Sequence, residues 1–413
     1  MALYRKRDSA TAGEDGRVRR RESIVPLSAG HACVDFYQGA VTALVPFFVA
    51  ERSYTYAAAS GIVLAASLLS SLAQPLFGAL TDRRALPWLL PVSTLLAGAG
   101  TAFAGVIASY ATTLTLVAIA GIGVAAYHPE SARLARRASR GSHTAMGWFS
   151  LGGNLGFACA PLLVALVMAG GGLGLTPVLI VPALVGAALC APALRGADTG
   201  SAARTGARTG GADLRSFAVL TLTLICRSVV FIGLGTFISL YAQERTGGGA
   251  SAGAIALFLL YLGGAAGTVV GGRLADRWDR VTVVRWSCLL TLPAVAGVVL
   301  VPGPALYLFV LLTSAGLYIP FSLQVTLGQD YLPNHVGTAS GITLGLTISV
   351  GGLASPLIGA LADATSLRTA LAPLIVLPAL AWLLVRLLAE PPAPPLAEPA
   401  PRPPLSGVGS TGG

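Results

Sequence analysis

The sequence has few charged side chains, and this scarcity excludes a water-soluble protein. Of 413 residues only 11% are charged, 54% are apolar, and the mean hydropathy is +0.75. A soluble domain of average composition carries about a quarter charged residues. The apolar residues come in runs of about 20, the length that a helix needs to cross about 30 Å of hydrocarbon. The sequence therefore predicts an all-α polytopic membrane protein.

Lysine, histidine and paired cysteine are also scarce. Lys6 is the only lysine, so the core has no Walker A or Schiff-base lysine and ATP-driven pumping is disfavoured. The four histidines, His31, His128, His143 and His335, form no HExxH motif, and no CxxC is present. We therefore predict no metal site and no cofactor. A membrane-embedded enzyme or a receptor would need an ordered catalytic constellation or a sizeable soluble domain, and neither is present.

Twelve apolar segments follow one another along the chain. They run over residues 28–50, 57–81, 88–107, 111–131, 143–169, 173–194, 216–241, 252–275, 282–301, 304–328, 337–361 and 369–389. With both termini inside, 23 of the 27 basic residues fall in cytoplasmic breaks, three in outer breaks, and Arg227 within a helix. This imbalance is the positive-inside rule, and it accounts for the net charge of +10 without a nucleic-acid partner.

The polar segments divide the chain. We expect a disordered cytosolic N-tail over 1–25, six-helix halves over 26–195 and 214–389, a Gly- and Arg-rich cytosolic linker over 196–213, and a Pro-rich cytosolic tail over 390–413.

The two halves repeat each other in parallel. Gly78-Ala-Leu-Thr-Asp82-Arg83 closes the second helix, and Gly272-Arg-Leu-Ala-Asp276-Arg277 closes the eighth, 194 residues later. Ser150-Leu-Gly152-Gly153 in the fifth helix returns as Ser349-Val-Gly351-Gly352 in the eleventh, 199 residues later. The fold predicted is therefore twelve transmembrane helices in two parallel six-helix repeats.

Twelve helices with a G-x-x-x-D-R loop after the second and the eighth resemble the major facilitator superfamily, over about residues 26–390. Three further stretches are similar to its fosmidomycin-resistance efflux group. They are His31-x-x-x-Asp35-x-Tyr37, Gly121-x-Gly123 through His128-Pro129-Glu130-Ser131, and Gly152-Gly153-Asn154-x-Gly156. The resemblance implies a proton-coupled exporter of the bacterial inner membrane, with a central cavity that opens alternately to each side.

The G-x-x-x-D-R loops are candidate gates. Asp82 and Asp276 could cap an opposing helix or pair with Arg83 and Arg277, and Gly78 and Gly272 would allow close approach. The alternative is that each Asp is a solvated turn acid. The loops also depart from the superfamily pattern, with Ala85-Leu86-Pro87 after the first and Trp278 in the second.

Small residues mark a second candidate gate in the fifth helix. Gly152, Gly156 and Ala160 recur every four residues and precede Pro161, which predicts a smooth packing face with a bend at its end. In antiporters that the chain resembles, such a stripe seals the cavity. Generic helix packing is the alternative.

Charged residues inside the predicted helices are candidates for coupling and binding. Asp35 is costly within a membrane, and His31 lies one turn earlier, so the two could share a proton. Arg227 occupies nearly the equivalent place in the second half, so the two charges could face each other across the cavity. A structural ion pair between the halves is the alternative for all three.

Pro129 should end and bend the fourth helix and turn its polar neighbours inward. Glu130 and His128 are then further proton-binding candidates, although Glu130 could instead pair with Arg133. Tyr37, Gln38, Asn154 and Gln324 are candidates for lining the cavity, and each could instead bond to a neighbouring helix.

The function expected is export of a small drug-like compound, possibly an anionic phosphonate or carboxylate, in exchange for protons. Arg227 suits such an anion because guanidinium binds it in a bidentate manner. The alternative is a proton-coupled importer of a sugar or an organic acid. Its partners would be the substrate, protons and membrane lipid, with the chain acting as a monomer.

Overall fold

The computed structural model describes residues 2–139, 143–191, 211–333, 339 and 341–391. Within these helices the side chains of residues 2–23, Asp82, Arg83 and several others lie outside the described part.

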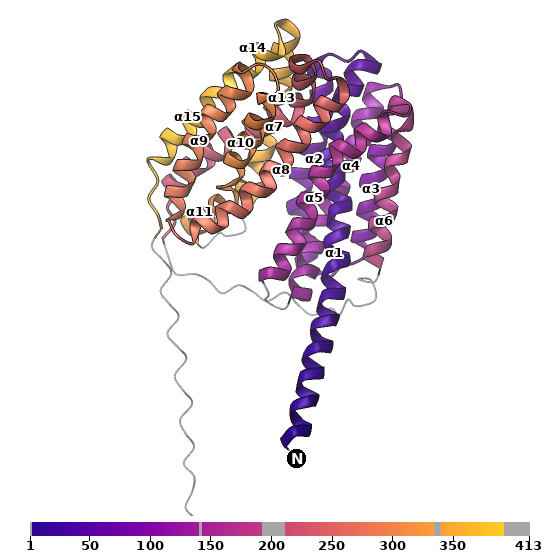
Figure 1. Ribbon diagram of the computed structural model, residues 1–413, viewed down its shortest axis with the longest axis vertical. Helices are drawn as coiled ribbons and strands as arrows, with labels where there is room; N and C mark the ends of the chain where they lie inside the picture. Colours follow the sequence, from indigo (N-terminus) through magenta and orange to yellow (C-terminus); the bar gives the residue numbers. More distant parts are fainter. Residues whose placement is uncertain (1, 140–142, 192–210, 334–338, 340, 392–413) are drawn as a thin grey trace, which may run out of the picture.

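The N-terminal half is a bundle of helical segments that run side by side (Figure 1). They are α1 (Ala2–Arg52), α2 (Tyr56–Arg83), α3 (Leu89–Ala104), α4 (Tyr110–Ser139), α5 (His143–Met168), and the 3₁₀ helix η1 (Gly172–Ile180) continued by α6 (Val181–Cys190). The described residues of α1 pack along α5, and α2 and α3 pack on α4.

The C-terminal half repeats this arrangement with more interruptions. It contains α7 (Leu214–Thr246), α8 (Gly249–Ala275), α9 (Arg280–Leu300), α10 (Ala305–Tyr318), α11 (Phe321–Tyr331), the π-helical turn η3 (Gly341–Leu346), α13 (Thr347–Ala364), α14 (Leu367–Leu371), η4 (Ala372–Ile375) and α15 (Val376–Val385). Pro320 separates α10 from α11, because its ring interrupts the backbone hydrogen bonding of one long segment.

The described residues form helices and no strands, which confirms the all-α fold class. Ten segments are long and apolar enough to cross a membrane, and Leu89–Ala104 and Ser349–Ala364 are shorter apolar helices. Together they correspond to the twelve apolar segments that the sequence predicts.

Two boundaries differ from the sequence-based prediction. Pro129 does not end α4, which continues to Ser139, because the residues that follow are mostly Ala, Arg and Leu, which favour helix. The first helix begins at Ala2, within the segment for which we predict a disordered tail. Extending an existing helix avoids the cost of nucleating a new one, so a polar segment can continue it.

Glycine allows the closest helix contact in the N-terminal half. A Cβ on Gly152 would collide with the carbonyl oxygen of Ser28, and one on Gly156 with that of Ala32. Helices α1 and α5 therefore touch backbone to backbone along the small-residue stripe. Pro161 follows within α5 and is buried.

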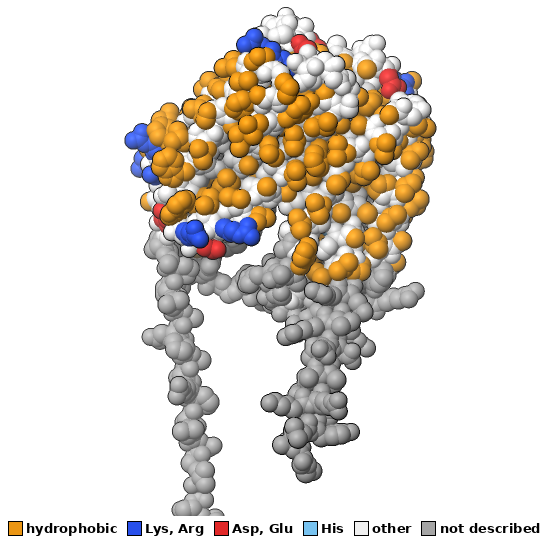
Figure 2. Space-filling model, viewed as in Figure 1, with side chains coloured by type: hydrophobic (Ala, Val, Ile, Leu, Met, Phe, Trp, Pro, Cys, Tyr) orange, Lys and Arg blue, Asp and Glu red, His pale blue; other side chains and the backbone are white. Residues whose placement is uncertain are grey.

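The halves meet at one end and separate at the other. We call the end where α6 stops and α7 begins the linker end, and the opposite one the far end. Toward the far end the hydroxyls of Thr42 and Tyr261 lie 2.5 Å apart, and the rings of Phe157 and Tyr261 pack with their centroids 4.1 Å apart. At the linker end the surface is notched between the halves (Figure 2). This conformation is open toward the linker end.

Candidate functional site

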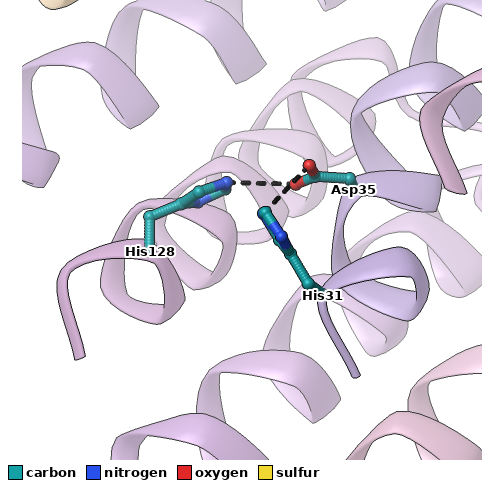
Figure 3. Close-up of side chains that lie close together, drawn as sticks. All are labelled: His31, Asp35 and His128. Atoms are coloured by element: carbon teal, nitrogen blue, oxygen red, sulfur yellow. Dashed lines mark ion pairs between the residues drawn. The ribbon is translucent and has the colours of Figure 1, made fainter. Parts of the chain in front are cut away.

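A cluster of three ionisable side chains lies inside the N-terminal half. Asp35 projects from α1, and its two carboxylate oxygens face two imidazoles, His31 from the same helix and His128 from α4 (Figure 3). Asp35 Oδ2 lies 3.2 Å from His31 Nε2, and Asp35 Oδ1 lies 3.1 Å from His128 Nε2. We call these three residues the triad. His31 and Asp35 lie on one helix face, as the sequence predicts. His128, which follows Asp35 by 93 residues in the sequence, approaches from α4.

Backbone carbonyls orient both imidazoles. His31 Nδ1 lies 2.9 Å from the Phe149 carbonyl oxygen, and His128 Nδ1 lies 2.8 Å from that of Val124. A carbonyl only accepts hydrogen bonds, so the proton of each neutral ring sits on Nδ1. A proton between either Nε2 and Asp35 is therefore additional to those of the neutral rings. Each Nε2 faces the Asp35 carboxylate.

The triad is enclosed but reachable. The side chains of His31, His128 and Asp35 are 10%, 24% and 14% exposed. The His31 ring stacks on Phe149 with centroids 4.3 Å apart, and Gln38 donates a 3.3 Å hydrogen bond to Asp35. His31 Nε2 is buried without a hydrogen-bond partner among the described residues.

Among the described residues, the triad is also the group of three whose ligand atoms converge enough to hold a metal ion, all within 4.8 Å of one another. The sequence does not indicate such a set, because its members lie on two helices with no motif spacing.

A second polar site lies in the C-terminal half. Arg227 on α7 is only 8% exposed and stacks on the rings of Phe321 and Tyr318, at 5.0 and 5.8 Å from their centroids. It lines a small pocket between helices of the C-terminal half. The other polar lining residues are Thr223, Thr291 and Gln324. Arg227 Nε and both amide atoms of Gln324 are buried without a hydrogen-bond partner in the described part of the chain.

The Arg227 guanidinium is a buried cation with an unpaired donor. An orphaned buried donor costs about 1–3 kcal/mol, and more when it is charged. Within the described residues Arg227 forms no ion pair with a carboxylate.

Asp35 and Arg227 form no ion pair with each other among the described residues, and their placement on opposing walls of one cavity stays a prediction. Asp35 lies against the two imidazoles, and Arg227 lies against aromatic rings of its own half. The sequence places both residues at similar depth, but the rotation of each helix about its axis decides which neighbour a side chain meets.

Two other candidates have local partners. Glu130 is fully buried and forms a bidentate pair with Arg133, one of its contacts being 2.9 Å, so it does not join the triad. Tyr37 is 1% exposed and donates to the Leu179 carbonyl at 2.8 Å, which places it in packing between α1 and η1, not in a cavity. Asn154 is half-buried on α5, one residue after Gly153.

The glycines of the two G-x-x-x-D-R loops at the linker end lie in open space in this conformation. A Cβ at Gly78 or Gly272 would meet nothing within 4 Å, so neither glycine serves a close approach here. Asp276 and Arg277 are exposed after α8, and the side chains of Asp82 and Arg83 lie outside the described residues. The separation of the halves at this end accounts for the missing contacts.

Sequence reasoning missed the role of Gly153. A Cβ there would collide with Asp35 Oδ2 and lie 2.6 Å from His31 Cε1, so this glycine makes room for the triad. Its place beside the Gly152 and Gly156 stripe is the only signal in the sequence, and all three glycines face α1.

The fold and sites define a multi-pass membrane protein of two six-helix halves with buried polar sites in each. The family model described as Major Facilitator Superfamily matches residues 27–356, and the chain belongs to that superfamily.

The similar proteins agree with this assignment. The chain is 28% identical to the fosmidomycin resistance protein of Escherichia coli (strain K12), over 83% of this chain and 86% of that one. It is 31% identical to the uncharacterized MFS-type transporter YfnC of Bacillus subtilis (strain 168), over 86% and 90%. A bacterial homologue of the human lysosomal transporter Spinster, solved in an inward-facing and occupied conformation, has the same fold, with a TM-score of 0.74. It is 17% identical, over 89% of this chain and 96% of that one.

Proposed function

We propose that this protein is a proton-coupled exporter that moves a small anionic, drug-like compound out of the cell by alternating access. The observation that carries the proposal is that the two halves hold different polar sites. A carboxylate between two imidazoles lies in the N-terminal half, and a pocket lined by Arg227, which has no acidic partner among the described residues, lies in the C-terminal half.

The triad would carry the protons. Each Nδ1 lies at a backbone carbonyl, so an extra proton on either Nε2 would face the carboxylate, and opening the cavity to either side changes the solvation that decides whether it stays. The Phe149 ring stacked on His31 limits the water that reaches the triad. Proton uptake on one side and release on the other then follows the conformational cycle.

Arg227 would bind the substrate. A guanidinium presents two parallel donors that match a carboxylate or phosphonate, and Gln324 beside it offers another amide donor. Stacking on Phe321 and Tyr318 holds the guanidinium in place without neutralising it.

The membrane potential and the proton gradient would supply the energy. One elementary charge crossing 100 mV gains about 2.3 kcal/mol, so an inward proton can drive an outward anion. The outward direction is supported by similarity to a protein named for fosmidomycin resistance, because resistance is what efflux would confer.

Transport in inverted membrane vesicles tests the proposal. Vesicles that carry the protein should accumulate labelled fosmidomycin when their interior is acidified, and a protonophore should abolish the accumulation. We expect Asp35→Asn and Arg227→Gln to lose it while still reaching the membrane.

Two controls match these variants in chemistry. The Arg386 guanidinium lies 5.1 Å from the centroid of the Trp382 ring, but it is exposed. Arg386→Gln therefore removes a similar cation that is not among the residues lining the Arg227 pocket. Glu244 is an exposed acid at the far end, and Glu244→Gln should keep transport. Accumulation that survives the protonophore, or equal loss in the control variants, contradicts the proposal.

A further inference from the structure

A carboxylate from one half caps a helix of the other half at the far end. Asp363, near the end of α13, accepts hydrogen bonds from the backbone N–H groups of Tyr56 at 2.8 Å and Ala57 at 3.0 Å. These are the first two residues of α2, whose N–H groups have no partner within the helix. The Thr55 hydroxyl accepts from Ala58 at 3.1 Å, so the whole first turn is satisfied only while the halves touch.

A glycine one turn before Asp363 makes the contact possible. A Cβ on Gly359 would lie 2.8 Å from the Ala57 nitrogen and the Tyr56 carbonyl group, closer than real Cβ atoms come. Helix α13 therefore meets α2 backbone to backbone, and the charge of Asp363 faces the positive end of the α2 dipole.

This contact repeats a sequence pattern found at the other end of the molecule. Gly359-Ala-Leu-Ala-Asp363 has the spacing of Gly78-Ala-Leu-Thr-Asp82 at the end of α2 and of Gly272-Arg-Leu-Ala-Asp276 at the end of α8. The two copies at the linker end have their glycines in open space, whereas the copy at the far end is engaged.

We propose that Asp363 and Gly359 form a far-end latch that stabilises the conformation open at the linker end. Opening of the far end withdraws the carboxylate and exposes two helix N–H groups. The latch therefore sets the balance between the two conformations without contacting the substrate. It rests on the alternating access of the proposed function, and on no feature of the substrate.

The latch predicts a measurable shift in populations. Loss of one helix cap corresponds to about a fivefold change in an equilibrium. Asp363→Ala should raise the ratio of far-end-open to far-end-closed molecules by roughly this factor. Asp363→Asn keeps one acceptor but loses the charge, so it should give a smaller shift in the same direction. Gly359→Ala should act as Asp363→Ala does.

Distances between spin labels would measure this ratio in purified full-length protein without substrate. Cysteines at Ala108 and Ala250, both exposed at the far end on opposite halves, would carry the labels, with the five native cysteines replaced. A second pair at Ala132 and Trp278 would report the linker end. We expect the far-end distances to lengthen and the linker-end distances to shorten in the latch variants.

Asp213→Ala and Gly174→Ala are the matched controls, because Asp213 caps α7 from within its own half and a Cβ on Gly174 would meet nothing within 4 Å. Their far-end distances should equal those of the unmodified latch. Distances unchanged in Asp363→Ala, Asp363→Asn and Gly359→Ala, or shifted equally in the controls, would overturn the latch. If the label distances do not shift but the vesicles still transport, the latch is wrong and the proposed function stands. If the distances shift but proton-driven transport is absent, the latch stands and the proposed function is wrong.

Discussion

Replacing Gly153 by alanine should uncouple the protein while leaving it folded. The added Cβ would overlap Asp35 Oδ2 and lie 2.8 Å from His31 Nε2. Both are side-chain atoms, and the carboxylate can rotate away at its far end. We therefore expect a cost in folding of about 1 kcal/mol, at the low end of the range for overpacking. The carboxylate can no longer lie between both imidazoles, so proton-driven transport should fall at least tenfold.

Alanine substitutions at two other glycines of the same half serve as comparisons for Gly153→Ala. Gly156→Ala places its Cβ against the Ala32 carbonyl group of the α1 backbone, which cannot rotate away, so it should destabilise the fold by about 1–3 kcal/mol. Gly174 has nothing within 4 Å of its Cβ position, and Gly174→Ala should match the unmodified protein in every assay.

The assay pairs thermal stability in detergent with initial transport rates in inverted vesicles at equal protein content. Gly153→Ala should keep its thermal midpoint near that of Gly174→Ala and lose transport, whereas Gly156→Ala should lose both. A Gly153→Ala protein that transports at the Gly174→Ala rate would refute the role of the triad geometry in coupling.

Three further predictions follow from the sites. The double variant Asp35→Asn with Arg227→Gln should stay as inactive as either single variant, because each residue has its own partners; recovered transport would show that the two are a charge pair. A strong chelator should leave transport unchanged, and loss of activity that added zinc restores would mean that the triad holds a metal. A cysteine at Ser201 should resist an impermeant maleimide in intact cells and one at Gly248 should react, and the reverse labelling would invert the predicted topology.

The sequence predicts the number, order and approximate ends of the membrane helices, because apolar length and basic loops are read directly along the chain. It also predicts the tight contact at Gly152 and Gly156, since a spacing of four residues places small side chains on one face. Those features are local, so no knowledge of the tertiary arrangement is needed.

Contacts that polar side chains make between helices are less predictable from the sequence. His128 meets Asp35 only because α4 is rotated to bring it to α1, and no pattern in a single sequence fixes that rotation. For the same reason Tyr37 faces η1 instead of a cavity, and Arg227 meets Phe321 and not Asp35.

The engaged latch at Asp363 carries a sequence signal, since it has the spacing of the other two copies, but its meaning depends on which end is closed. That depends on the relative position of the two halves, which the local pattern does not contain.

Proton movement driven by the substrate tests the central claim most directly. Inverted vesicles would be acidified inside, and the recovery of a pH-sensitive dye would be followed after fosmidomycin is added outside. The account predicts immediate proton efflux with the unmodified protein and Arg386→Gln, and none with Asp35→Asn or Gly153→Ala. Uptake of labelled fosmidomycin with no accompanying proton efflux, or proton efflux that persists in Asp35→Asn, would contradict it.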